Sequence, residues 1–555
     1  MLLLMIVVLP FLGLVLPLLA GHGRRALCTL LAALAPLVAL ALLLTLADAT
    51  LSGLVLQAGF EWLPGLGLNP GLRLDGLGLL FSLLILGIGL LVILYAHYYL
   101  GEDEPVGRFY AFLLLFMGAM LGLVLSANLL QMLVFWELTS LSSFLLIGFW
   151  GHRSDARRGA RMALAVTGGG GLALLAGILL IGQVVGSFDL ATVLAAGDLI
   201  RAHALYPLIL VLVLLGVFTK SAQFPFHFWL PHAMAAPTPV SAYLHSATMV
   251  KAGVFLLARL YPALSGTDLW FYLVSFTGLI TLLFGAVMAL FQHDLKGLLA
   301  YSTIGHLGLI TLLFGLDTRL AAVAAVFHII NHATFKASLF MAAGIIDHET
   351  GSRDMRRING MWHYMPHTAV LAMVAASAMA GVPLLNGFLS KEMFFAETLS
   401  STHLGGFGWL IPAGATLAGA FAVAYSLRFI HDVFFNGEPI NLPKFPPHEP
   451  PRYMKVPVEV LVFICLLVGI LPAYTVAPLL AAAAGASLNG PLPEYSLAIW
   501  HGFNLPLLMS GLALVAGCVL YCLRKPLFRW FAGLPEVDAK EVFETVVVRL
   551  VGRAR

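Results

Sequence analysis

The strongest constraint on the fold is a series of apolar runs, each near 20 residues long and separated by short polar breaks. A helix of about 20 apolar residues spans the hydrocarbon core of a bilayer. The runs cover residues 2–20, 27–48, 76–98, 109–127, 129–149, 161–183, 205–230, 241–261, 268–290, 296–315, 320–345, 367–395, 408–434, 455–479 and 503–522. Only 10% of the residues are charged, against about 25% in soluble domains. The sequence therefore predicts an all-α polytopic membrane protein with about 15 transmembrane helices.

Basic residues gather in alternate loops, which predicts the orientation of the chain. No charged segment precedes the first run, and Arg24 and Arg25 follow it, so we expect residues 2–20 to be a span and not a signal peptide. The loops on one side hold Arg24, Arg25, Arg153, Arg157, Arg158, Arg161, Lys296, Arg353, Arg356, Arg357, Arg452, Lys455, Arg524 and Lys525. The opposite loops hold Arg73, Arg201 and Arg319. We therefore expect a multi-pass protein of the cell inner (plasma) membrane. By the positive-inside rule, its N-terminus is on the outer side and its C-terminus is cytoplasmic.

Two of the runs carry signals of a broken helix. The seventh contains Lys220 and Pro225, and the twelfth contains Gly381 and Pro383 ahead of Lys391. The two runs lie five spans apart, and inverted-repeat transporters place broken helices at corresponding positions of two halves. We therefore predict two inverted five-helix repeats.

The chain divides accordingly into six segments. They are a two-helix segment with an outer loop (1–75), a third span with an inner loop (76–108), the first repeat (109–261), the second repeat (262–434), C-terminal spans (435–522) and a tail (523–555). Charged and apolar residues alternate along the tail, which favours an amphipathic helix on the inner surface.

Glu137 and Lys220 are the first pair of ionisable residues at membrane depth. A lysine near the centre of a membrane helix costs about 2.5 to 3.5 kcal/mol, so such residues persist where they line a protein-enclosed path. The alternatives are a Lys220 that reaches the interface as an anchor and a Glu137 satisfied by local hydroxyl groups. Because burial of either charge is costly without a partner, we predict that the two act as a pair.

Further titratable residues follow in later spans. His245 and Lys251 share the eighth run, where a continuous helix would set them about 120° apart. His328, His332 and Lys336 stand at i, i+4 and i+8, on one helical face. Neutral imidazole accepts and donates a proton, which favours a relay; a zinc site is the alternative, although no cysteine or carboxylate nearby completes it.

Lys391, beside Glu392, is the last of these ionisable residues. His306 lies in the tenth run, near Ser302. The expected roles of Lys391 are ion translocation or an interfacial ion pair with Glu392. We predict one lateral row that links Glu137, Lys220, Lys251, Lys336 and Lys391.

Other chemistry has little support in the sequence. Cys28, Cys465, Cys518 and Cys522 lie in apolar runs without ligand partners, so we expect no metal and no cofactor. The glycine run Gly168–Gly171 lacks the lysine of a phosphate loop and suits helix packing. The net charge of +3 and the scattered basic residues do not indicate a nucleic-acid partner.

Four segments resemble the antiporter-like membrane subunits related to respiratory complex I. They are Phe135–Ser140, Thr219–Pro231, Ala236–Gly253 and Asp294–Thr303, and His328 to Lys336 is similar to the histidine pattern of the eleventh helix in that family. The eighth run, with Lys251 after His245, looks most like the A-type subunit of Mrp-type multisubunit Na⁺/H⁺ antiporters.

The resemblance implies a function and a set of residues. Glu137 and Lys220 are implied to be the carboxylate–lysine pair, and His245, Lys251, Lys336 and Lys391 the hydrophilic axis. The implied function is that of a membrane component of a multisubunit cation/proton antiporter, which makes the chain part of a secondary transporter and not an enzyme. The implied partners of the chain are other membrane subunits and the lipid bilayer. The implied transported ions are H⁺ and Na⁺ or another monovalent cation. The A-type subunit of this family continues well past the position of Arg555, in a region implicated in sodium handling.

Two other functions use the same core. One is the proton-pumping arm of a quinone- or hydrogenase-linked redox complex, and the other is a membrane partner of an inorganic-carbon uptake enzyme. The partner chains discriminate among the three. Small multispan partners favour the antiporter, flavin or iron–sulfur chains favour the redox complex, and a zinc-bearing soluble chain favours the carbon enzyme.

Overall fold

The computed structural model describes residues 1–20, 23–63, 65, 67, 69–400, 403–534 and 545. Within these residues, thirteen helices are long and apolar enough to cross a membrane, and Tyr206–Lys220, Pro366–Ala380 and Ala477–Leu488 are shorter apolar helices. The chain is a multi-pass membrane protein, as the sequence predicted. The tail beyond Leu534 lies outside the described residues except for Thr545, so the expected amphipathic helix there stays a prediction.

The helices follow one another along the chain with few strands. The first part contains α1 (Leu2–Gly13), α2 (Leu16–Leu19), α3 (Arg25–Leu51), β1 (Leu56–Gly59), β2 (Gly71–Leu74), α4 (Gly76–Tyr99), α5 (Val106–Leu125), α6 (Leu129–Ile147), α7 (Ser154–Val185), α8 (Leu190–Ala195), α9 (Gly197–Ala202), α10 (Tyr206–Lys220), η2 (Phe226–Phe228), α11 (Trp229–His232), η3 (Ala233–Ala235), α12 (Thr238–Ser246) and α13 (Lys251–Leu264). The second part contains α14 (Asp268–Trp270), η4 (Phe271–Ser275), α15 (Phe276–Phe291), α16 (Leu295–Gly315), α17 (Arg319–Thr350), η5 (Met361–His363), α18 (Pro366–Ala380), α19 (Asn386–Leu399), η6 (Gly405–Phe407), α20 (Leu410–Leu427), η7 (Arg428–Asp432), α21 (Arg452–Ile470), α22 (Pro472–Thr475), α23 (Ala477–Leu488), α24 (Leu505–Cys522) and α25 (Arg524–Ala532).

Side-chain caps and glycines set several helix ends. Asp75 accepts a hydrogen bond from Gly78 N at the start of α4, and Asp294 does the same for Gly297 N at the start of α16. These caps satisfy backbone donors that the first turn of a helix leaves open. At the other end of α17, Gly351 adopts a left-handed conformation with φ of 69°, which favours glycine.

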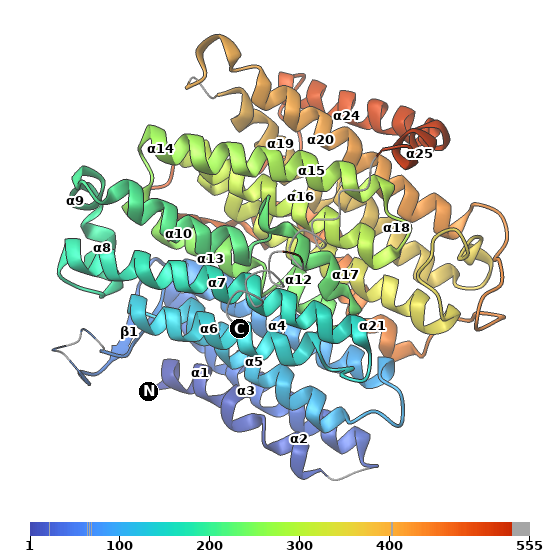
Figure 1. Ribbon diagram of the computed structural model, residues 1–555, viewed down its shortest axis with the longest axis horizontal. Helices are drawn as coiled ribbons and strands as arrows, with labels where there is room; N and C mark the ends of the chain where they lie inside the picture. The colour runs from blue at the N-terminus through green and yellow to red at the C-terminus, as the bar shows by residue number, and fades with distance from the viewer. Residues whose placement is uncertain are drawn as a thin grey trace.

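The two ends of the bundle can be told apart by their loops. The antiparallel pair β1–β2, with Leu56 opposite Leu74, marks one end, which we call the hairpin face. Asp294 pairs with Asp354 in a β-bridge at the other end, which we call the Asp294 face. The N-terminus lies near β1 in Figure 1.

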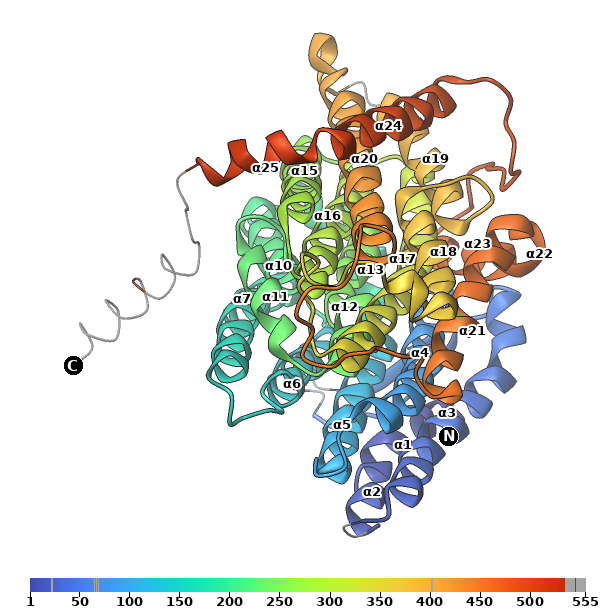
Figure 2. The same ribbon diagram turned by 90° about the vertical axis from the view of Figure 1, so that its right-hand side faces the viewer.

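The core of the molecule is α17. The apolar window of α17 is wholly buried, whereas that of α3 is 33% buried and that of α24 is 28% buried. Figure 1 shows α1 and α3 at one edge of the bundle and α20 with α24 at the opposite edge. The helix α24 packs along α20, and α25 continues from it, as Figure 2 shows. Polar side chains on α17 are therefore shielded from lipid on every side.

Both helix breaks predicted from the sequence are confirmed. After α10 the chain turns through Ala222, with φ of 48°, and after α18 it turns through Gly381 and Leu384, with φ of 88° and 69°. The broken spans run in opposite directions. Tyr206 at the start of α10 donates a hydrogen bond to Leu264 O near the hairpin face, while His367 N at the start of α18 donates to Glu449 at the Asp294 face.

Two details differ from the sequence prediction. The eighth span has a break of its own, because α12 ends at Ser246 and α13 begins at Lys251. The run 455–479 contains parts of three elements, because α21 ends at Ile470, the short helix α22 begins at Pro472, and α23 begins at Ala477. Proline at the first position of a helix favours a new start, which accounts for the second difference.

Candidate functional site

Lys220 is the last residue of α10, and its ammonium group lies inside the bundle against α6. Its side chain is fully buried. Nζ donates hydrogen bonds to Trp136 O at 3.1 Å and to Ser140 Oγ at 2.7 Å, and lies 5.1 Å from the centre of the Trp136 ring. These partners flank Glu137 on α6, and the charges of Lys220 and Glu137 interact. The structure therefore brings the predicted pair together, with α6 oxygens as the direct ligands of the ammonium group.

Glu137 faces α7, where the glycine run makes room for its carboxylate. A Cβ added at Gly171 would lie 1.5 Å from Glu137 Oε1, and one at Gly168 would lie 4.0 Å from Oε2. Glu137 Oε1 has no hydrogen-bond partner within the part of the chain that the structure describes. The sequence favoured helix packing for these glycines, and the structure adds a specific reason: any side chain at Gly171 would displace the carboxylate.

The break after Lys220 leaves backbone groups that other elements satisfy. Trp229 Nε1 donates to Thr219 O at 2.9 Å, and Thr281 Oγ1 accepts from Phe224 N at 2.9 Å. Ser221 Oγ donates to Val250 O at 2.6 Å, which joins the end of α10 to the start of α13. Non-helical backbone at membrane depth is tolerated only when it is enclosed and satisfied in this way.

Lys251 occupies the first position of α13, directly after the unpredicted break. Its buried Nζ donates to Ser246 O, the last residue of α12, and lies 2.9 Å from His332 Nδ1 on α17. The expectation of one continuous helix through His245 and Lys251 is therefore wrong. No proline marks the break, so its only signal in the sequence is the polar segment Ser246–Thr248.

Three histidines from two helices meet next to Lys251. His306 on α16 and His328 on α17 lie 2.9 Å apart between Nδ1 and Nε2, and His328 Nδ1 lies 3.0 Å from Ser390 Oγ on α19. The rings of His306 and His332 are 5.2 Å apart. All three side chains are at most 3% exposed. We call Lys251, His332, His306, His328 and Ser390 the histidine row.

His306 and Ser390 extend the set of candidate residues chosen from the sequence. His306 was recognisable as a histidine one turn from Ser302 in an apolar run, yet it gave no sign of its contact with α17. Ser390 carried no signal of its own, because serine is common beside helix breaks. Within the described residues, no group of three His, Cys, Asp or Glu side chains could hold a metal ion.

Lys336 and Lys391 lie at the far end of this arrangement. Lys336 Nζ donates to Ser302 Oγ at 2.6 Å and to Met379 Sδ at 3.2 Å. Lys391 Nζ donates to Met379 O at 2.7 Å and to Ala380 O at 3.0 Å, the carbonyls freed where α18 ends. Met379 therefore lies between the two ammonium groups. A cavity of about 20 Å³ touches Lys391, His306 and Tyr425, which is room for roughly one water molecule.

His245 is buried but stands apart from the histidine row. Its ring lies 6.3 Å from the Trp229 ring and 6.3 Å from the Phe340 ring. Both ring nitrogens lack a hydrogen-bond partner within the described residues. His245 lies in the last turn of α12, directly before Ser246, whose carbonyl accepts from Lys251.

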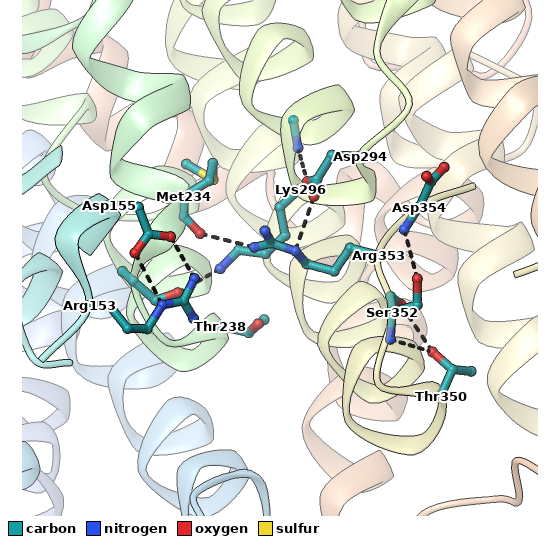
Figure 3. A network of polar contacts seen from close by, with 12 residues as sticks. Arg153, Asp155, Met234, Thr238, Asp294, Lys296, Thr350, Ser352, Arg353 and Asp354 are labelled. Carbon is teal, nitrogen blue, oxygen red and sulfur yellow. Dashed lines mark hydrogen bonds and ion pairs between the residues drawn. The ribbon is translucent and has the colours of Figure 1, made fainter. Parts of the chain in front are cut away.

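Lys296 belongs to a polar network at the Asp294 face, which Figure 3 shows. Lys296 Nζ donates to Ala236 O at 2.7 Å, and Arg353 bridges Asp294 at 3.0 Å and Met234 O at 3.2 Å. Nearby, Arg153 pairs with Asp155 at 2.6 Å. The sequence analysis counted Lys296 among the basic residues of the inner loops; the structure places it in the first turn of α16, with its side chain 1% exposed.

Asp75 and Arg259 form a buried ion pair at the hairpin face. The two oxygens of Asp75 accept from Arg259 Nη1 at 2.5 Å and Nη2 at 3.0 Å, and Arg73 Nε adds a third bond at 3.0 Å. Burial opposes ionisation of Asp75, but the arginine charges and the bond from Gly78 N outweigh it and hold the pKa of Asp75 well below its usual range. The pair fixes α13, and so Lys251, relative to α4.

The fold and the buried charged groups define a polytopic membrane protein with an ionisable interior. A family model described as NADH:quinone oxidoreductase/Mrp antiporter, TM matches residues 126–416, and one described as NADH-Ubiquinone oxidoreductase (complex I), chain 5 N-terminus matches residues 62–110. The chain belongs to the NADH:quinone oxidoreductase/Mrp antiporter family.

Individual relatives agree with this assignment. The chain is 43% identical to the A-type subunit of a Na(+)/H(+) antiporter from Alkalihalophilus pseudofirmus, over 93% of its own length and 67% of the relative. It is 61% identical to a Rhizobium meliloti protein named as the probable A/B-type subunit of a K(+)/H(+) antiporter, over 90% of its length and 50% of the relative. A chain in the structure of the Mrp complex from Dietzia sp. is 36% identical with a TM-score of 0.89, and the match covers 100% of this chain and 60% of that one. The chain thus spans about half to two thirds of these relatives.

Proposed function

We propose that this chain is a membrane component of a multisubunit cation/proton antiporter and that it moves protons along its buried lysines and histidines. The histidine row carries the proposal. From Lys251 to His332, from His306 to His328 and from His328 to Ser390, the polar atoms are 2.9 to 3.0 Å apart. A proton can pass between groups at this separation without crossing apolar space. Between His332 and His306 the ring centres are 5.2 Å apart and no hydrogen bond joins the two rings among the described residues, so the proposed path requires one ring to rotate at this step.

The proposed path begins at the Asp294 face. Protons reach Lys251 past Lys296 and His245, and Lys251 passes a proton from Nζ to His332 Nδ1, which it already contacts at 2.9 Å. Each neutral imidazole then accepts a proton on one nitrogen and releases one from the other. Lys391 receives the proton at the α18–α19 break. The positive charge on Lys391 then disfavours the protonated form of Lys336.

In the proposal, Glu137 and Lys220 couple the first repeat to this path. Lys220 is held by α6 oxygens on either side of Glu137, so a shift of α6 changes the distance between the two charges. A change in that distance alters which of them is protonated. Ser221, next to Lys220, bonds the backbone just before Lys251, which supplies a mechanical link between the repeats.

The names of the relatives guide the choice of ion and partners. Na⁺ or K⁺ is the proposed counter-ion, and the proposed partners are other membrane subunits, with the Asp294 face in the cytoplasm. In this role the chain is part of a secondary transporter and not a catalytic enzyme. A proton-pumping role in a redox complex is the second candidate, because both family models that match also describe complex I.

The test is ion exchange in everted membrane vesicles that contain the assembled complex. Lys251→Ala should abolish Na⁺- or K⁺-dependent proton movement while the complex still assembles. Lys525→Ala, which removes an exposed charge on α25, is the matched control and should leave exchange unchanged. Normal exchange by assembled Lys251→Ala would refute the proposed path.

A further inference from the structure

A cavity of about 490 Å³ opens at the Asp294 face, where α5 begins, α6 ends and α7 begins. It lies away from the proposed proton path. Its lining contains Arg108, Phe112, Phe144, Leu145, Gly148, Phe149, Gly151, His152, Arg157, Ala160 and Arg161. The lining thus combines three arginines and a histidine with four large apolar side chains, and it includes no carboxylate.

Two of the three arginines, Arg157 and Arg161, have no carboxylate partner among the described residues. Arg161 is exposed and makes no hydrogen bond or ion pair with the residues that the structure describes. Arg157 donates to the carbonyls of Gly151 and His152, which shapes the loop and leaves its charge unpaired. Arg108 lies 5.1 Å from the centre of the Phe149 ring.

Two of the acids near the cavity, Glu104 and Asp155, have other hydrogen-bond partners. Glu104 accepts from Trp150 Nε1 at 2.5 Å, and Asp155 binds Arg153 at 2.6 Å. Glu102, Asp103 and Glu104 line a separate cavity that Arg108 also touches, whereas the charges of Arg157 and Arg161 remain open to an anion from outside this chain.

The cavity also crosses the boundary between polar and apolar surroundings. Phe112, Phe144 and Leu145 are half-buried, lie within the apolar spans and face the same opening as the arginines. An inorganic anion would use only the arginine end. A phospholipid presents a charged phosphodiester next to apolar chain, which matches both parts of the lining.

We propose that this cavity binds the headgroup of an anionic phospholipid from the adjacent leaflet. The phosphodiester lies between Arg108, Arg157 and Arg161, and the start of an acyl chain packs on Phe112 and Phe144. Basic pockets between membrane helices on the cytoplasmic side bind acidic headgroups in this way. A lipid bound there contacts α5, α6 and α7 at once. Glu137 lies on α6, and the glycines that make room for its carboxylate lie on α7.

The test measures lipid binding by the chain of residues 1–555, purified in detergent and stripped of lipid. Micelles with phosphatidylglycerol should raise its unfolding temperature, while phosphatidylcholine or inorganic phosphate should not. Each arginine near the membrane surface is worth about fivefold in affinity for acidic lipid. Arg108→Gln/Arg161→Gln should therefore weaken phosphatidylglycerol binding roughly 25-fold. The variant Lys525→Gln/Arg529→Gln, which removes two charges from α25, should leave this binding unchanged.

The single variant Arg161→Gln keeps the test decisive if the double variant fails to fold, because Arg161 has no partner to lose within the described chain. This single variant should weaken phosphatidylglycerol binding about fivefold. Four results would overturn the proposal: equal effects of phosphatidylcholine, equal effects of inorganic phosphate, an equal loss in the α25 variant, or unchanged binding by both arginine variants. A photo-crosslinker at position 152 that captures an acidic segment of a partner protein in native membranes, and no lipid, would also overturn it.

Discussion

The two buried charged regions of the molecule are built differently. In the glutamate–lysine region, Lys220 bonds Trp136 O and Ser140 Oγ on either side of Glu137, no hydrogen bond joins Lys220 to Glu137 among the described residues, and the carboxylate lies against glycines of α7. In the histidine row, titratable groups from α13, α16 and α17 contact one another at 2.9 Å. The first region is therefore suited to a change of distance between two charges, and the second to passage of protons between fixed groups.

Among substitutions that keep both Lys220 and Lys251, the largest effect should come from filling the space beside Glu137. Gly171→Ala would set a methyl group 1.5 Å from Oε1, so the carboxylate must move by an ångström or more. Misplacement of that size can cost about a hundredfold in rate, and we expect a comparable fall in proton exchange by vesicles. Gly169→Ala is the control, because a Cβ there meets nothing within 4 Å. Equal rates for the two variants would mean that the position of Glu137 is unimportant.

Loosening the ion pair at the hairpin face should come next. Asp75→Asn keeps the size and removes the charge that Arg259 faces, and a lost hydrogen bond to a charged group costs about 2 kcal/mol. The pKa of Asp75 is lowered in the folded protein, so its stabilisation is present above the unfolded pKa of about 4 and is lost as pH falls below it. The unfolding temperature of the variant should therefore be lower than wild type at pH 7.

The same measurement at acidic pH sharpens this prediction. The gap between Asp75→Asn and wild type should narrow progressively below about pH 4. A gap that stays constant from pH 7 to pH 3 would show that the charge of Asp75 is not the source of the stabilisation.

Within the histidine row, His306→Gln should slow exchange roughly tenfold, below the hundredfold or more that loss of a proton-transfer group can cost. The effect is limited because His328 keeps Ser390 and His332 keeps Lys251. The pH profile of exchange should change as well. Thr311→Ala on the same helix, whose hydroxyl bonds only Leu307 O, should leave both rate and profile unaltered; a matching decline there would point to damage of α16 in general.

The smallest effect should follow Ser140→Ala. Lys220 loses one hydrogen bond but keeps Trp136 O, so exchange should fall about threefold, in line with the net value of one hydrogen bond. Ser142→Ala is the matched change, because that hydroxyl bonds only carbonyls of its own helix. If the two variants behave alike, Ser140 does not act through Lys220.

Hydropathy and helix-breaking residues were enough to predict the spans and the two breaks, because membrane insertion imposes a length on each apolar run. The break before Lys251 was missed because no proline or glycine marks it.

The membership of the histidine row was also only partly predictable. His328 and His332 stood out by their spacing, but the contact with His306 depends on how α16 packs against α17, which periodicity does not encode. The segment boundaries at residues 75, 108, 261, 434 and 522 stay predictions.

The proposed mechanism requires the histidine row to work only together with the glutamate–lysine region. Proton exchange by the assembled complex with Lys220→Ala tests this requirement, because every group of the histidine row is intact in that variant. We expect Na⁺- or K⁺-dependent exchange to be abolished although the subunits still assemble. Near-normal exchange by the assembled variant would show that the histidine row conducts protons without the glutamate–lysine region, and the proposed coupling would be wrong.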